Sequence, residues 1–167
     1  MAMKMKVDGM TEISEMLSSM EEKAGSVAAG ALYEGARLMA EEINKGAAEI
    51  QTAPFNFAPP GKTRLPSPEE KQIIQTAAAG IAKFNRNGTE VDTSVGFRNS
   101  GYAELEGKMV PIPKIVNAVN SGTSFMKKQP FVRKSSSKAT PKVLEKMRKY
   151  IEAAFNEINK KYTSSMK

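Results

Sequence analysis

Apolar residues recur at helical spacing over the first third of the chain. Ile13, Met16, Leu17 and Met20 lie on one face of a helix that would begin near Thr11, after a short alternating strand at residues 3–7. Gly25-Ser26 interrupts this pattern, and the apolar positions resume and continue to about Ile50. The sequence therefore predicts two successive helices, separated at Gly25-Ser26, before residue 51.

Two glycines lie between the apolar positions of the second of these helices. Gly30 and Gly35 each destabilise a helix by about 1 kcal/mol relative to alanine. A residue without a side chain lets another element approach the helix closely. We therefore expect this face to pack tightly against a neighbouring element of the core.

The next helix has a strong start signal. Ser67 is a good N-cap, Pro68 suits the first helical position, and Glu70 completes a capping box with Ser67. Ile73, Ile74, Ala77, Ile81 and Phe84 then follow at intervals that resemble a helical face. The spacing predicts a helix that ends at Asn87-Gly88.

Strict alternation of apolar and polar residues marks the clearest strand, residues 89–97. Asn99-Ser100-Gly101 is a turn signal, so residues 102–105 are predicted to return as the hairpin partner of this strand. Residues 106–113 are predicted to be a loop. Pro113 would open a short helix that ends at Gly122, where a positive φ can close it.

The last helix is predicted to start at Thr140-Pro141 and to run to about Lys160, with residues 163–167 as a frayed tail. We expect its apolar face to pack against the sheet. At 100° per residue this face holds Leu144, Met147, Ile151, Ala154, Phe155 and Ile158.

These elements predict an α+β fold, in which a small antiparallel sheet packs against long helices and a long helix ends the chain. With 167 residues, the chain suits one domain, residues 1–162. The proline-rich loop at residues 51–66 carries two apolar aromatics, Phe55 and Phe57. This loop is expected either to act as an arm on a neighbouring subunit or to fold back on the core.

The amino-acid composition excludes most of the common catalytic mechanisms. The chain has no cysteine and no histidine, so the commonest nucleophiles, general bases and zinc ligands are missing. Gly61-Lys62-Thr63 lacks the upstream glycine of a phosphate-binding loop, and Glu41-Glu42 points to two sides of a helix. We expect a protein that is not an enzyme and that binds no cofactor or metal; carboxylate catalysis is a weaker alternative.

Positive charge concentrates near the C-terminus. Residues 126–167 hold 12 Lys or Arg against 3 Asp or Glu, whereas the whole chain has a net charge of +7. In the last helix, one face carries Lys138, Lys142, Lys146 and Lys149. This basic face could be a solvated surface, a contact for an acidic protein, or a contact for DNA phosphates without base recognition.

The stretch around which the rest is arranged runs from Asn117 to Val132. Gly122-Thr123 ends a short apolar helix, six residues follow, and Pro130-Phe131 precedes the last helical segment. A loop of this kind is predicted to hold one shape, with Phe131 buried beneath it and with Lys127 and Lys128 pointing outward. An ordinary capped helix and turn would have the same pattern.

Gly122-Thr123, the six-residue gap and Pro130-Phe131-Val132-Arg133 together resemble a signature of tailed-phage neck proteins. These are the head–tail joining or tail-completion proteins of the gene-product-ten-like family. The chain departs from the family where Ile115-Val116 replaces a Tyr-Ala pair and Lys134-Ser135 replaces Pro-Ala.

The resemblance implies a structural protein of the virion, at the neck of a tailed phage or prophage, that joins the tail to the connector. It also implies a homo-oligomeric ring, such as a hexamer, with connector and tail-tube proteins as neighbours, only non-specific DNA contact and no membrane. The motif residues that it places at subunit or partner interfaces are Gly122, Thr123, Pro130, Phe131 and Arg133. Our interpretation of the two loops adds Phe55, Phe57, Lys127 and Lys128 to this predicted interface. The alternative from another class is a small basic non-specific DNA-binding protein.

Overall fold

The computed structural model describes residues 10–53, 61–87, 90–98 and 100–165. The predicted α+β class is confirmed: four helices accompany two small antiparallel sheets of two strands each. The predicted strand at residues 3–7 and the two loop aromatics, Phe55 and Phe57, lie outside the described residues.

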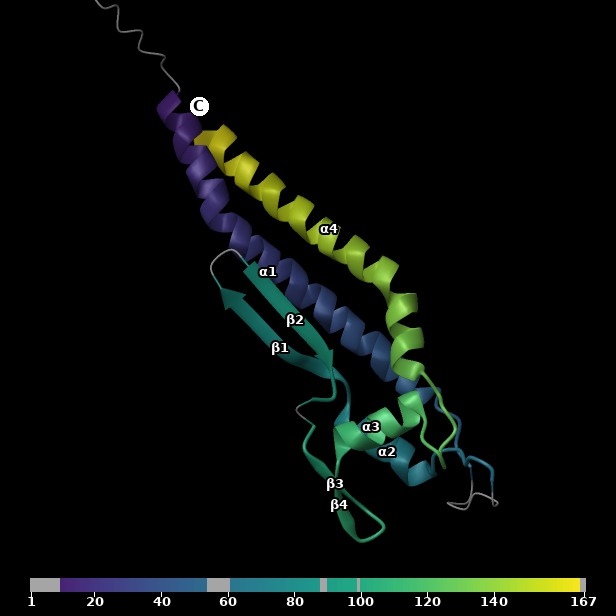
Figure 1. The fold of residues 1–167 in the computed structure, drawn as a ribbon. Helices are drawn as coiled ribbons and strands as arrows, with labels where there is room; N and C mark the ends of the chain where they lie inside the picture. The colour runs from purple at the N-terminus through teal and green to yellow at the C-terminus, as the bar shows by residue number, and fades with distance from the viewer. Residues whose placement is uncertain (1–9, 54–60, 88–89, 99, 166–167) are drawn as a thin grey trace, which may run out of the picture.

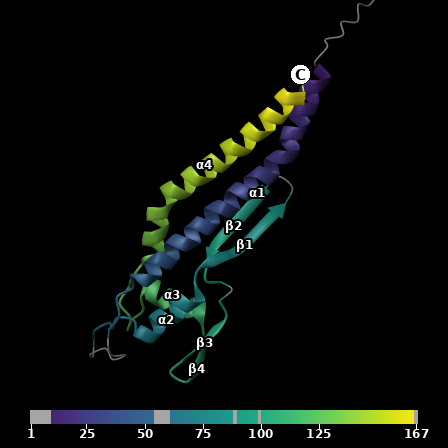
Figure 2. The same ribbon diagram turned by 180° about the vertical axis from the view of Figure 1, so that it is seen from behind.

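Two long helices form the body of the molecule. α1 (Met10–Ala48) and α4 (Phe131–Ser165) run side by side, and the start of α1 lies beside the end of α4 (Figure 1). The β1–β2 hairpin lies along another side of α1, as the reverse view also shows (Figure 2). The two shorter helices and the second hairpin gather at the far end of this body.

The division of α1 into two helices was a wrong prediction. The helix is continuous through Gly25, which is buried, and it ends at Ala48. A single glycine costs a helix only about 1 kcal/mol, and this cost is small beside the packing of a 39-residue helix against α4.

The predicted start of the last helix was also wrong. α4 begins at Phe131 and includes Pro141 in its interior. A proline removes one helical hydrogen bond and bends a helix, and Figure 1 shows α4 bending in its first third. The helix extends to Ser165, so most of the tail predicted to fray is helical.

The buried side of α4 faces α1 rather than the sheet, which corrects the prediction. Val143 and Ile158 are buried, whereas Leu144 is 60% exposed. A helix that packs on another helix buries a narrow stripe, and Leu144 lies beside this stripe rather than within it.

α2 (Pro68–Ala77) begins as predicted but ends sooner. Ser67 caps it through the Glu70 N–H, and Ala78 ends it with a φ of 53°. The residues predicted to continue the helix form a strand, β1 (Gly80–Asn87), so that prediction was wrong. The Asn44 side chain of α1 exchanges two hydrogen bonds with the Ala79 backbone, at 2.6 and 3.1 Å, and this ties the extended segment to α1.

The strand pairing differs from the prediction. β2 (Glu90–Gly96) is the predicted strand, but its antiparallel partner is β1. β3 (Tyr102–Leu105) pairs instead with β4 (Lys108–Pro111), which lies where a loop was predicted. Apolar–polar alternation identifies a strand but does not identify its partner, since a neighbouring hairpin satisfies the same backbone groups.

The main core lies where the end of α1 meets α2, α3 (Ile112–Ser121) and the start of α4. α3 has the predicted limits: Pro113 is in its first turn, and Gly122 ends it with a φ of 78°. Its buried face packs against the other elements of this core. The buried side chains here include Ile43, Ile50, Ile74, Phe97, Ile115, Val116, Val119, Met126 and Phe131.

The expectation that glycines permit close packing in α1 is confirmed. A Cβ at Gly35 would lie 2.8 Å from the Met147 sulfur of α4. A Cβ at Gly46 would overlap the Ser135 hydroxyl, and one at Gly30 would overlap the Tyr150 ring. The glycines of α1 therefore let α4 approach its backbone.

We predict opposite outcomes for two glycine substitutions on this seam. Gly46→Ala should lower the free energy of unfolding, because Ser135 is buried in the rigid first turns of α4. Gly30→Ala should be neutral or stabilising by up to about 1 kcal/mol, because the half-exposed Tyr150 ring can rotate away while alanine favours the helix. Urea unfolding of both variants measures the difference, and equal destabilisation would contradict it.

Candidate functional site

The loop from Gly122 to Pro130 is held at both ends by backbone hydrogen bonds. The Gly122 N–H donates to the Ala118 carbonyl at 2.9 Å, which closes α3. The Gln129 N–H donates to the Val119 carbonyl at 2.8 Å, which returns the loop to the same helix. The Asn120 side chain accepts a hydrogen bond from the Val132 N–H at 3.1 Å. The end of α3 and the start of α4 are thus joined across the loop.

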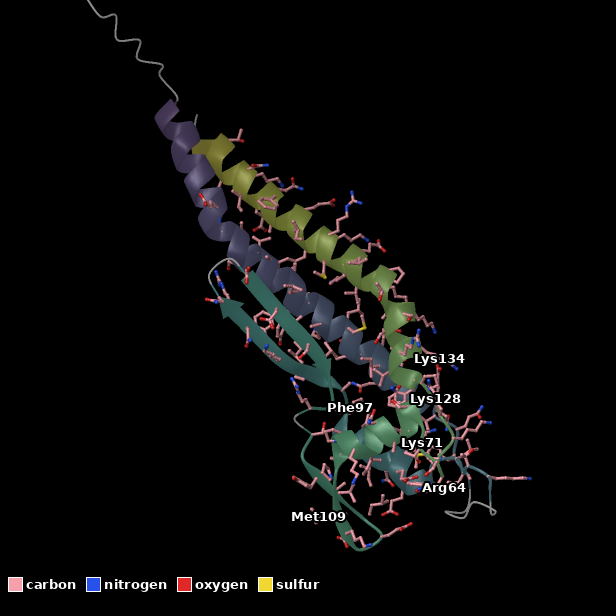
Figure 3. The ribbon with its side chains drawn as sticks, in the orientation of Figure 1. Arg64, Lys71, Phe97, Met109, Lys128 and Lys134 are labelled. Carbon is pink, nitrogen blue, oxygen red and sulfur yellow. The ribbon has the colours of Figure 1, made fainter. Side chains whose placement is uncertain are left out.

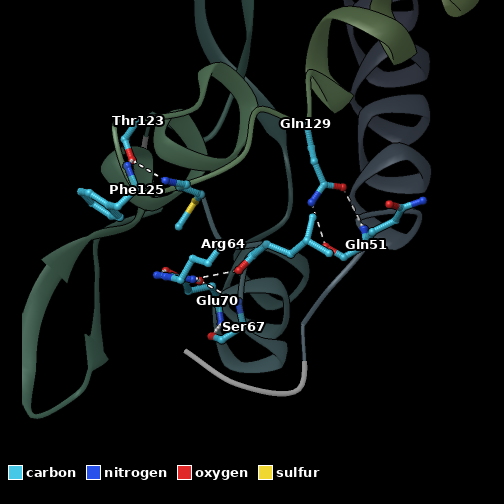
Figure 4. A network of polar contacts seen from close by, with 9 residues as sticks. Gln51, Arg64, Ser67, Glu70, Thr123, Phe125 and Gln129 are labelled. Carbon is cyan, nitrogen blue, oxygen red and sulfur yellow. Dashed lines mark hydrogen bonds and ion pairs between the residues drawn. The ribbon is translucent and has the colours of Figure 1, made fainter. Parts of the chain in front are cut away.

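Thr123 shapes the interior of the loop. Its hydroxyl oxygen accepts from the Met126 N–H at 3.0 Å, and its own N–H donates to the Met126 carbonyl at 3.0 Å (Figure 4). Met126 is buried, whereas Phe125 beside it is 56% exposed. The turn therefore buries one large side chain in the core and presents the other to solvent.

A second segment of the chain braces this loop. Arg64 and Met126 form a short parallel bridge, in which the Arg64 N–H donates to the Phe125 carbonyl and the Lys127 N–H donates to the Arg64 carbonyl, both at 2.7 Å. The Gln129 side chain also exchanges two hydrogen bonds with the Gln51 backbone, at 2.8 and 2.9 Å (Figure 4). The ends of the proline-rich loop are therefore tied to the Gly122–Pro130 loop.

Arg64 is itself held by a buried ion pair. Its guanidinium donates to both carboxylate oxygens of Glu70 at 2.6 and 2.7 Å, and only 13% and 5% of the two side chains are exposed. Burial opposes ionisation of Glu70, but the hydrogen bonds from Arg64 and from the Ser67 N–H outweigh it and lower the pKa of the carboxyl group. The sequence identified Glu70 only as part of the capping box of α2. Its ion pair with Arg64 could not be predicted, because a separation of six residues matches no regular helix or strand spacing.

Phe131 anchors the loop as predicted. Only 6% of it is exposed, and its ring meets the Phe97 ring edge-to-face, with 6.3 Å between the ring centroids. Gly122 has the predicted positive φ, and a Cβ there would lie 3.0–3.2 Å from Lys128 atoms, two of them backbone. The predicted positive φ of Gly122 and the predicted burial of Phe131 are thus both confirmed.

The other predicted interface residues of this loop and of the start of α4 lie at the surface of the protein. Lys127, Lys128 and Arg133 are exposed, and Pro130 is half-buried immediately before α4. Lys127 and Lys128 line a recess of about 270 Å³ together with Lys134 and the end of α1. Figure 3 shows Lys128 and Lys134 on the same side of the molecule.

The basic face of α4 is partly neutralised within the chain. Lys142 lies 3.9 Å from Glu42 of α1, and Lys149 forms an ion pair of 2.7 Å with Glu145. The hydrogen bond from Lys45 is the main cause that lowers the pKa of Glu42, and the charges of Lys142 and Lys138 add to it. Three of the four lysines thus act on carboxylates of their own chain, or pair with them, which weakens the case for a dedicated phosphate-binding face.

Within the described residues, no group of three or more acidic side chains is arranged to hold a metal ion. No helix of that part of the chain has both the length and the apolar character needed to cross a bilayer. No family model, curated protein or solved structure matches the chain. The site is therefore defined by its geometry alone: a surface loop with two exposed lysines, held by backbone hydrogen bonds to α3 and to the Arg64 segment.

We predict that Gly122→Ala destabilises the fold by about 1–3 kcal/mol. The φ of 78° and ψ of 166° lie in a region that is almost restricted to glycine, and the Lys128 backbone crowds the new methyl group. Gly101→Ala is the matched control, since Gly101 has a φ of 74° and open space around it. Thermal melting should show the larger loss for Gly122→Ala; an equal or larger loss for Gly101→Ala would mean that crowding by Lys128 contributes nothing.

Proposed function

We propose that this protein is a structural subunit at the neck of a tailed phage or prophage, where it completes or terminates the tail and joins it to the connector. The observation that carries the proposal is the Gly122–Phe131 loop. Its sequence resembles the neck-protein signature, and its backbone is held at both ends by α3, α4 and the Arg64 segment.

Rigidity supports a role in assembly. A loop held in one shape loses little conformational entropy when a partner binds, so more of the contact energy appears as affinity. Lys127 and Lys128 are exposed on this loop, and contact with an acidic neighbour would use them without disturbing the core. In this proposal the protein forms a homo-oligomeric ring in the virion and acts in no catalytic step.

The test is complementation of a phage that lacks the gene. Lys127→Glu with Lys128→Glu should fold with an unchanged melting temperature, because both residues are exposed, but should fail to restore tailed particles, because the reversed charges would repel an acidic neighbour. Lys146→Glu with Lys160→Glu, an equal charge change on the exposed surface of α4, should restore them. If the variant with Lys127→Glu and Lys128→Glu restores normal tailed particles, the loop does not contact a partner during assembly.

Binding to duplex DNA should be weak, electrostatic and strongly dependent on salt. We expect this because the exposed lysines of α4 have neighbouring carboxylates and the described surface presents no element suited to reading bases. Fluorescence anisotropy with labelled duplexes of different sequence measures it. Sequence-selective binding tighter than about 10⁻⁷ M at physiological salt would replace the neck proposal with a DNA-binding function.

A further inference from the structure

The β3–β4 hairpin presents an unusual outward face. Its inward side chains, Ala103, Leu105 and Val110, pack against the core. On the other face, Tyr102 and Met109 are each 66% exposed, and the paired register places Glu104 directly opposite Met109. A carboxylate thus lies beside two large apolar side chains that the described chain leaves uncovered.

The recess beside the Gly122–Pro130 loop has the opposite character. Lys127, Lys128 and Lys134 supply three positive charges around it, and Glu49 is the only carboxylate among its lining residues. The positive end of the α4 helix dipole also lies at this recess, because Pro130 and Phe131 line it. Its volume of about 270 Å³ is below that of typical small-molecule pockets and suits a single side chain.

Apolar surface surrounds the positive charge in this recess. Leu65 and Pro130 are half-buried lining residues, and Ile50 and Phe131 lie deeper. A carboxylate with apolar neighbours would complement such a recess better than a DNA phosphate, whose neighbours are sugar and other phosphates. The hairpin face has this composition.

We infer that the β3–β4 hairpin of one copy docks into the lysine recess of the next copy, with Glu104 between Lys127 and Lys128 and with Tyr102 and Met109 against the apolar rim. The inference deepens the proposed function and rests on it, since it supplies the contact from which a ring would be built. The two surfaces are on opposite sides of the molecule's lower end, where Figure 3 labels Met109 and Lys128.

This separation determines the kind of assembly. A contact between two different patches is heterologous, so each copy has one hairpin to give and one recess to fill. Such contacts form a closed ring when the rotation between neighbours closes, and an open filament when it does not. A two-fold dimer would instead bring the same patch of both copies together.

Site-directed cross-linking tests the inference, and the absence of cysteine from the chain makes each introduced thiol unique. Met109→Cys, which leaves the opposite Glu104 carboxylate in place, and Lys128→Cys, which leaves Lys127 and Lys134, should each fold normally, since both positions are exposed. Mixed at high concentration under mild oxidation, the two variants should form disulfide-linked heterodimers in excess of the proportion that random pairing gives. The variant with both substitutions in one chain should form a ladder of covalent oligomers.

A matched pair and the phage assay complete the design. Glu157→Cys, an exposed position on α4, should give no excess of heterodimer with Lys128→Cys. Random pairing of Met109→Cys with Lys128→Cys overturns the docking inference, and it leaves the neck proposal intact if the wild-type gene restores tailed particles. A wild-type gene that cannot restore them overturns the neck proposal whatever the cross-linking shows.

Discussion

Phe131→Ala should lower the free energy of unfolding by about 3–5 kcal/mol, the range for truncation of a buried phenylalanine. The ring is 6% exposed, packs edge-to-face on Phe97, and begins α4 directly after the Gly122–Pro130 loop. Its loss would leave a cavity where α3, the loop and α4 meet. For a chain of this length, the melting temperature should fall by on the order of 10 °C.

Phe125→Ala is the matched control for this substitution. It removes the same ring from the same loop, but Phe125 is 56% exposed, so its melting temperature should change little. Calorimetry of both variants separates the anchor from a general sensitivity of the loop. If Phe131→Ala melts like the wild type, the loop is held without its aromatic anchor.

Glu70→Gln should be the second most damaging change, with a loss of about 3 kcal/mol or more at neutral pH. The substitution keeps the shape of the side chain and most of its capping ability, but it removes the carboxylate that pairs directly with the Arg64 guanidinium, 13% exposed, and leaves only the weaker electrostatic effect of Glu106. Breaking a buried pair by removing one partner costs about 3–5 kcal/mol. Glu69→Gln makes the same charge change in the same helical turn at an exposed position, and should cost well under 1 kcal/mol.

The same ion pair predicts a dependence on pH. The pKa of Glu70 is lowered on folding, so its contribution to stability is fully present above the ordinary carboxyl value of 4.5 and is lost as the pH falls through the lower folded value. The stability difference between wild type and Glu70→Gln should therefore narrow progressively below about pH 4.5. Urea unfolding across the acid range measures this, and a constant difference would show that the charge of Glu70 is not its source.

Local signals in the sequence determined the elements that depend on local chemistry. The Ser67–Glu70 capping box started α2, Pro113 and Gly122 bounded α3, and strict alternation identified β2. Each of these depends on hydrogen bonds or φ preferences that involve only a few neighbouring residues. The exposure of Lys127 and Lys128 and the burial of Phe131 were predicted instead from side-chain polarity.

Tertiary contacts decided the rest. α1 passes through Gly25 and α4 includes Pro141, because packing between two long helices outweighs the cost of the glycines in one and of the proline in the other. Residues 80–87 form a strand because β2 pairs with their backbone and Asn44 holds the preceding Ala79, although Ile81 and Phe84 have helical spacing. The bracing of the candidate site by Arg64, Glu70 and Gln51 joins residues far apart in sequence or without periodic spacing, so only the fold could reveal it.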